Sequence, residues 1–189
     1  MNQFCRDFEN LLKKSPPEEA LHQFVVKHPV LLEEFGGPLY ISKPSLGRDY
    51  TADFAVRTVG NGIFWTFIEL ERSSHPLFTR QGLPSKALNT AIMQINQWFS
   101  WLRDHASPGY GVFDGERSGV VVIGKRDRLS ALDLRRLRSF NETHISVRVV
   151  TWDTLIDPFK SMSDSLMKAK EREAPKVLGD AEFRMQSAI

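Results

Sequence analysis

The feature that most constrains the fold is a series of three β-like segments between residues 38 and 71. They read PLYISKPSL, YTADFAVRT and IFWTFIELE, and they are rich in the β-branched and aromatic residues that favour strands. The turn Gly60-Asn61-Gly62 joins the second segment to the third. It favours a hairpin, because Gly and Asn accept the positive φ angles of tight turns. The sequence therefore predicts an antiparallel meander over residues 38–71.

Two helices are predicted before this meander. Residues 3–14 and 18–28 each place apolar side chains along one helical face. Glu18 and Glu19 suit the first turn of the second helix, because the helix dipole stabilises negative charge there. Pro29 ends the second pattern, since a proline disfavours helical geometry in the residue before it.

Helices and strands alternate after the meander. Ser85 is a typical N-cap for a long helix with an apolar stripe, which Pro108-Gly109 ends. The apolar runs GVVVIG and ISVRVVTW predict two buried strands, with one helix beginning after Ser130 between them and another opening at Asp153. Residues after about 160 are charged and poor in large apolar groups, which predicts a frayed helix or a tail.

This order of elements predicts a mixed α/β sheet flanked by helices. The 189 residues, with 41% hydrophobic and 25% charged side chains, fit one globular domain. We divide the chain into an N-terminal helical segment (1–36), a core (37–158) and a C-terminal helix or tail (159–189).

Other features of the sequence bear on where the protein works. The single cysteine, Cys5, excludes an internal disulfide framework and a cysteine-rich zinc site, and we interpret it as a packing residue. The chain has no apolar run of the roughly 20 residues that a membrane span needs. Its first residues lack the basic and then apolar layout of a secretory signal. We therefore expect a cytoplasmic protein with no membrane attachment.

Two acidic residues at the end of the third β-like segment carry the functional prediction. Glu69 and Glu71 are two apart in a strand, so both side chains lie on one face. The apolar neighbours indicate a buried strand, in which two carboxylates cost free energy unless a cation compensates them. The hairpin places Asp53 opposite Glu69, and oxygen ligands without Cys or His suit Mg²⁺ or Mn²⁺. The alternative is that Asp53 and Glu71 face solvent or pair with nearby arginines.

The motifs around these acids resemble a known family. ADF at 52–54 and WTFIELER at 65–72 resemble the split acidic motif of the PD-(D/E)XK nuclease superfamily. More narrowly, the chain resembles the nuclease domain of Shedu anti-phage defence proteins from about residue 24 to residue 155. The matching stretches are FVVKHPVLL (24–32), ISKPSLGRDYTADFAV (41–56), FIELER (67–72), HPLFTRQGLPS (75–85), AIMQINQWFSWL (91–102), VVVIGKR (120–126) and VVTWDTL (149–155).

The resemblance implies a restriction-endonuclease-like core and a metal-dependent DNA endonuclease in antiviral defence, with Asp53, Glu69 and Glu71 as metal ligands. It also implies homo-oligomers. One residue departs from the family pattern, which usually has lysine where this chain has Glu71. A glutamate cannot supply a cation, but it can bind a second metal ion or accept a proton from water. Lys43 and Lys86 are alternative sources of the missing amine.

Residues of the long helix and of the preceding loop complete the predicted site. Family resemblance implies that Gln94 faces the active site, where its amide would hold water or a phosphate oxygen; the alternative is a polar residue at the edge of the core. Trp98 and Trp101 extend the apolar stripe, so we interpret them as core or interface rather than as base-stacking platforms. We interpret His75 as an incidental loop histidine; the alternative is a contact to substrate or metal.

Basic residues are the predicted contacts to DNA. The formal net charge is only +2, but positive residues cluster at 125–138 and around the acidic strand. The cluster at 125–138 is equally explained as the solvated face of a surface helix. The predicted nucleic-acid-binding residues are Arg72, Arg80, Lys86, Lys43 and Arg48.

Two other functions remain open from the sequence alone. The replaced lysine is compatible with a catalytically impaired nuclease-fold module that binds DNA or a partner protein. A structural or regulatory assembly protein is the third hypothesis, in which exposed aromatic side chains around Trp98 and Trp101 form an interface. We expect a nuclease of this kind to be restrained by assembly or by a regulatory partner protein.

Overall fold

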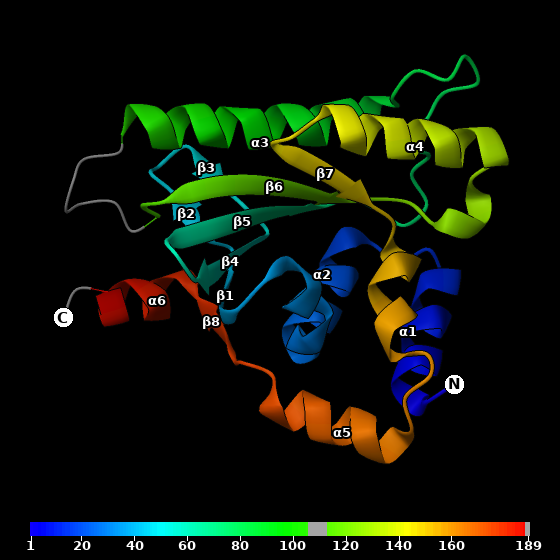
Figure 1. Ribbon diagram of the computed structural model, residues 1–189, viewed down its shortest axis with the longest axis horizontal. Helices are drawn as coiled ribbons and strands as arrows, with labels where there is room; N and C mark the ends of the chain where they lie inside the picture. The colour runs from blue at the N-terminus through cyan, green and yellow to red at the C-terminus, as the bar shows by residue number, and fades with distance from the viewer. Residues whose placement is uncertain (106–112, 188–189) are drawn as a thin grey trace.

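The computed structural model describes residues 1–105 and 113–187, and a six-stranded mixed sheet forms its centre (Figure 1). The order across the sheet is β7-β6-β5-β4-β1-β8. The strands are β1 (Pro38–Ser42), β4 (Phe54–Val59), β5 (Ile63–Leu70), β6 (Glu116–Val122), β7 (Val147–Val150) and β8 (Val177–Gly179). Strands β1, β4 and β5 are antiparallel, whereas β6, β7 and β8 each pair in parallel with a neighbour. The predicted mixed α/β sheet is confirmed.

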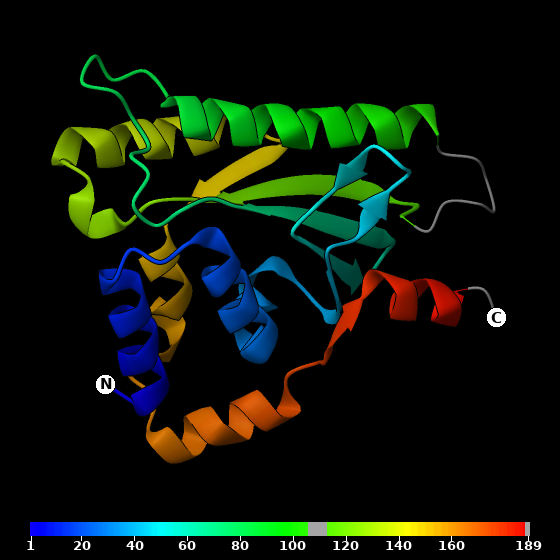
Figure 2. The same cartoon turned by 180° about the vertical axis from the view of Figure 1, so that it is seen from behind.

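Helices cover both faces of this sheet. Figures 1 and 2 show α3 and α4 on one face and the N-terminal helices on the other. The helices are α1 (Gln3–Lys13), α2 (Glu18–Lys27), α3 (Lys86–Asp104), α4 (Ala131–Thr143), α5 (Asp164–Glu173) and α6 (Asp180–Ser187), with 3-10 helices η1 (Pro29–Phe35), η2 (Arg126–Arg128) and η3 (Trp152–Phe159). Within the described ranges, no helix is both long and apolar enough to cross a membrane.

Each face of the sheet has its own apolar core. In β5, Phe67 packs in the cluster on the α3 side, whereas Ile68 and Leu70 pack in the cluster with α1, α2 and η3. Strand alternation produces this division, since successive side chains point to opposite faces. Cys5 is fully buried in the second of these clusters, which confirms its packing role.

The hairpin register agrees with the prediction from the Gly60-Asn61-Gly62 turn. Val59 pairs with Ile63 and Phe54 with Ile68, so Asp53 lies opposite Glu69 one position further along. The first β-like segment is less regular than predicted. It breaks at Pro44, which lacks an N–H for pairing, and β2 (Ser45–Leu46) and β3 (Tyr50–Thr51) then form a separate two-stranded sheet.

The predicted helix starts are confirmed by their caps. Ser85 Oγ accepts a hydrogen bond from Leu88 N–H at the start of α3. Ser130 and Asp133 form a reciprocal capping box at the start of α4. Pro108-Gly109, expected to end the long helix, lies outside the described residues.

The C-terminal segment differs from the prediction of a frayed helix or tail. Residues 164–187 form α5, β8 and α6, and Leu178 of β8 is buried in the core on the α3 side. A strand of three residues is too short for a periodic pattern, and its hydrogen bonds to distant β1 are invisible in the local sequence. The helix expected at Asp153 is the 3-10 helix η3, which contains Pro158.

Candidate active site

The candidate site lies where β5 ends beside the start of β4. Asp53 directly precedes β4, Glu69 is near the end of β5, and Glu71 follows that strand. The exposed fraction is 6% for Asp53 and 8% for Glu69, so both carboxyl groups are buried, and Glu71 is half-buried. The hairpin therefore brings acidic side chains from two neighbouring strands to one place.

Asp53 is held by contacts on both carboxylate oxygens. Its Oδ2 accepts a hydrogen bond of 2.7 Å from Leu70 N–H, and its Oδ1 contacts Lys43 Nζ. The backbone reinforces this arrangement, because Lys43 N–H donates to the Asp53 carbonyl at 2.9 Å. Lys43 has a φ of 51°, a left-handed conformation that is uncommon for a non-glycine residue. The strand break at Pro44 thus places the ammonium group of Lys43 on Asp53, one of the three predicted metal ligands.

Glu69 lies in an environment that opposes its ionisation. Burial and, to a lesser extent, the nearby carboxylates of Asp53, Glu71 and Glu18 together raise the pKa of its carboxyl group to about 9. The ammonium group of Lys43 acts in the opposite direction. Desolvation and like charge both destabilise an anion, so ionised Glu69 needs a compensating cation.

Glu71 forms an ion pair with His75. Its Oε2 lies 3.0 Å from His75 Nδ1, and burial is the main reason that the pKa of Glu71 is raised. The backbone of Glu71 is fixed as well, because its N–H donates to the Val122 carbonyl at 2.8 Å and its carbonyl accepts from Trp152 Nε1 at 2.7 Å. The loop after β5 folds back and places the imidazole of His75 on Glu71, and whether His75 has a functional role stays a prediction.

Glu18 is a further acid near the site that sequence reasoning assigned only to the helix dipole. It is the first residue of α2 and is half-buried. Its pKa is raised chiefly by burial and then by the carboxylates of Asp53 and Glu71. The pattern of α2 could not reveal this proximity, because it depends on how the helix packs against the end of the sheet.

His22, one turn after Glu18, is buried beside Asp53. Its ring stacks on Phe54 with centroids 4.6 Å apart, and its Nε2 lies 3.2 Å from Ser42 Oγ. Burial lowers the pKa of His22, and the charge of Lys43 lowers it further. The imidazole is therefore held neutral and forms part of the wall behind Asp53.

The acids of the site are suitable ligands for a hard divalent ion, but their side chains do not point to one common position. Within residues 1–105 and 113–187, no three His, Cys, Asp or Glu side chains have the arrangement needed to hold a metal ion. Asp53 is turned to Lys43, and Glu71 is turned to His75. The carboxylate oxygens around buried Glu69 are of the kind that Mg²⁺ or Mn²⁺ prefers. Binding by Asp53, Glu69 and Glu71 together requires these two ion pairs to rearrange, and the metal site stays a prediction.

The family comparison bears on the whole region just described. A family model described as Shedu protein SduA, C-terminal, matches residues 15–156, about three quarters of the chain. The chain belongs to this Shedu family. The matched region runs from before α2 into η3 and contains Asp53, Glu69 and Glu71. Membership suggests a Shedu-type defence protein. No curated protein matches the chain.

In this Shedu domain a pocket of about 430 Å³ opens beside Glu71. His75, Lys86 and Thr90 are among its lining residues, together with the N-cap of α3. Gln94 is half-buried on α3, one turn beyond Thr90. Its predicted role at the active site stays a prediction, as does phosphate binding by Lys86.

The remaining predicted DNA contacts are exposed. Arg72 follows Glu71 directly, Arg80 lies in the loop before α3, and Arg48 lies in the turn between β2 and β3. Lys43 is exposed as well, but its ammonium group is already engaged with Asp53.

The two tryptophans of α3 pack inward. Trp98 is 1% exposed and belongs to the core, which confirms the core interpretation and rules it out as an exposed interface residue. Trp101 is half-buried, and a Cβ on Gly47 would lie 2.3 Å from its ring. Its indole therefore packs directly on the β2–β3 turn.

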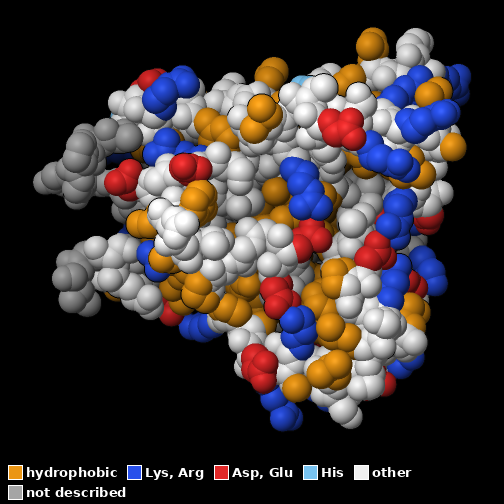
Figure 3. All heavy atoms as spheres, viewed as in Figure 1, with side chains coloured by type: hydrophobic (Ala, Val, Ile, Leu, Met, Phe, Trp, Pro, Cys, Tyr) orange, Lys and Arg blue, Asp and Glu red, His pale blue; other side chains and the backbone are white. Residues whose placement is uncertain are grey.

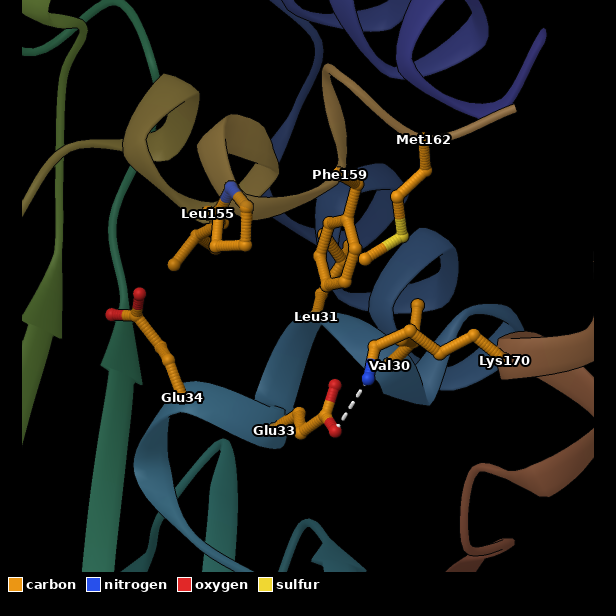
Figure 4. Close-up of a pocket in the computed structure, with 9 residues that line it drawn as sticks. Val30, Leu31, Glu33, Glu34, Leu155, Phe159, Met162 and Lys170 are labelled. Carbon is orange, nitrogen blue, oxygen red and sulfur yellow. Dashed lines mark hydrogen bonds and ion pairs between the residues drawn. The ribbon is translucent and has the colours of Figure 1, made fainter. Parts of the chain in front are cut away.

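A second pocket, of about 270 Å³, lies between η1, η3 and α5 (Figure 4). Leu31, Leu155 and Phe159 form part of its apolar wall, and the ion pair between Glu33 and Lys170 (2.7 Å) crosses its edge. It contains none of the predicted site residues. The three predicted acids, Asp53, Glu69 and Glu71, gather instead at the end of β5.

Proposed function

We propose that this Shedu domain is a divalent-metal-dependent DNA endonuclease of anti-phage defence. The observation that carries the proposal is the burial of Glu69 among other carboxylates, which raises the pKa of its side chain to about 9. Such an arrangement costs stability, and groups with strongly shifted pKa values are found mostly at functional sites. A bound Mg²⁺ or Mn²⁺ ion would compensate the charge that the protein concentrates there.

Asp53 and Glu69 would hold the ion, with Glu71 as a further ligand or as the acceptor of a proton from water. When bound, the ion supplies activated water and neutralises negative charge that develops on the phosphate. Leu70 N–H holds Asp53 Oδ2, so the carboxylate would stay at the end of β5 when Lys43 releases Oδ1 for the ion. This hydrogen bond favours binding at a defined position.

Lys43 would take the role of the lysine that Glu71 replaces. Its ammonium group already contacts Asp53, and its side chain is 47% exposed, so it can reach both the site and an incoming phosphate. Lys86 is the weaker candidate, because it lies at the start of α3 on the edge of the neighbouring pocket. The uncommon backbone conformation of Lys43 supports a functional role, since such conformations cluster at active sites.

The test is cleavage of supercoiled and linear DNA in the presence of Mg²⁺ or Mn²⁺. Asp53→Ala and Glu69→Ala should abolish cleavage while circular dichroism shows an intact fold. Asp49→Ala, a matched change of an exposed acid in the β2–β3 turn, should leave cleavage unchanged. Mn²⁺ should raise the melting temperature of the unmodified protein and not that of Asp53→Ala. Full cleavage by either site variant would remove the proposed roles.

The second candidate function is a non-catalytic module that binds DNA or a partner protein. The replacement of the motif lysine by Glu71, paired with His75, favours it. DNA binding without cleavage in any divalent metal, and no Mn²⁺-dependent rise in melting temperature, would support this function. Homo-oligomers and a regulatory partner remain part of the proposal and are tested by the mass of the purified protein in solution.

A further inference from the structure

The candidate site cannot attract DNA by itself. Asp53, Glu69, Glu71 and Glu18 concentrate negative charge at the end of β5, and a phosphodiester approaching them is repelled until cations compensate. Residues 125–138, in contrast, contain six Lys or Arg and two Asp in a chain whose formal net charge is only +2. The rest of the chain is therefore slightly negative. This basic segment can therefore attract DNA where the acidic site cannot.

The basic segment forms a surface on η2 and α4. The inner side of α4 packs on β7, where Asn141 exchanges two hydrogen bonds with the Val149 backbone (2.9 and 2.8 Å). No residue of α4 is fully buried, and Arg135 and Arg138 are exposed one turn apart. In the described part of the chain, neither of these two arginines forms an ion pair. Both guanidinium groups are therefore available to an external anion.

This surface is continuous with the loop that follows the acidic strand. Arg128 Nη1 donates to the Ser74 carbonyl at 3.3 Å. A Cβ on Gly82 would lie 2.3 Å from Cζ of Arg136, so that guanidinium packs directly on the loop backbone. Figure 3 shows Lys and Arg side chains gathered on the side of the molecule where α4 and this loop lie. Arg128 and Arg136, the second of which also pairs with Asp133, therefore connect the α4 surface to the loop that follows Glu71.

We propose that duplex DNA lies across the η2–α4 surface, with Arg135 and Arg138 on its phosphates, and that the loop of residues 72–83 leads the backbone to the acidic site. The inference rests on the proposed function for its partner. Guanidinium groups suit phosphate because they form two parallel hydrogen bonds to its oxygens. Arg72 and Arg80 are exposed in this loop and would continue the contact.

The test is binding of a short fluorescent DNA duplex, measured by anisotropy at several salt concentrations in EDTA, so that cleavage plays no part. The double variant Arg135→Gln/Arg138→Gln should bind more weakly. The slope of the logarithm of affinity against that of salt should fall by about two, one for each lost phosphate contact. The matched control is Lys168→Gln/Arg172→Gln, which removes two exposed charges from α5 and should leave the slope unchanged.

Three outcomes would overturn the inference: equal losses in both double variants, an unchanged salt slope, or an altered oligomeric state of the α4 variant with DNA affinity retained. The last would identify α4 as a contact between copies of the chain. The test distinguishes a failure of the DNA surface from a failure of the proposed nuclease activity. Binding that depends on Arg135 and Arg138 without cleavage in any metal would refute the nuclease alone. Cleavage with affinity independent of these arginines would refute the DNA surface alone.

Discussion

Replacing Glu69 by glutamine should stabilise the metal-free protein at neutral and alkaline pH. Glutamine keeps the shape of the side chain and removes its charge. Glu69 is 8% exposed, and its pKa is raised from 4.5 to about 9 by burial and by neighbouring carboxylates. The native state therefore holds a proton that the unfolded state releases above pH 4.5. Because the native state binds the extra proton, stability falls as pH rises from about 4.5 to about 9 and then levels off.

The size of the effect follows from the same shift. A pKa unit corresponds to about 1.4 kcal/mol, so the roughly 3.5 units between pH 4.5 and pH 8 set an upper limit of about 5 kcal/mol. Lys43 and relaxation around the site reduce this value, and we expect about 1–2 kcal/mol for Glu69→Gln at pH 8. In a domain of this length that is roughly a 2–8 °C rise in melting temperature. Near pH 4.5 the difference should vanish.

Thermal unfolding in EDTA from pH 4.5 to pH 9 measures this dependence. Glu142→Gln, which changes an exposed glutamate on α4, is the matched control and should leave the pH profile unchanged. A Glu69→Gln protein that is less stable than the unmodified protein at pH 8, or that shows the same difference at pH 4.5, would refute the reasoning. It would mean that burial and the neighbouring carboxylates do not destabilise the ionised form of Glu69.

Two further predictions concern Lys43 and the C-terminal strand. Lys43→Met should reduce cleavage by roughly 100-fold or more, because it removes the cation beside Asp53, and Lys43→Arg should restore part of the rate; equal rates for the methionine and arginine variants would argue against a charge-based role. Leu178→Ala should lower stability by about 2–3 kcal/mol in chemical denaturation, because Leu178 is buried in the core on the α3 side. An unchanged denaturation midpoint would show that β8 contributes no more to the stability of the fold than a frayed tail would.

The sequence alone determined the structural features that depend on residues close together in the chain. The Gly60-Asn61-Gly62 turn sets the register of β4 and β5, since a short loop leaves few ways to pair the flanking strands. Ser85 and Ser130 begin helices because their hydroxyl groups accept hydrogen bonds from nearby N–H groups. The two-residue spacing of Glu69 and Glu71 and the hairpin register together placed three acids at one end of the sheet. These features depend on neighbours in sequence, and sequence reasoning predicted them.

Tertiary packing decided which charged groups surround those acids. Lys43 reaches Asp53 because the chain breaks at Pro44, Glu18 arrives on a packed helix, and His75 returns on a loop. Strand β8 joins the sheet through hydrogen bonds to β1, more than a hundred residues away in the sequence. Such contacts gain free energy only once the whole sheet and its helices assemble. No local pattern records them, and the electrostatics of the site became visible only in the folded chain.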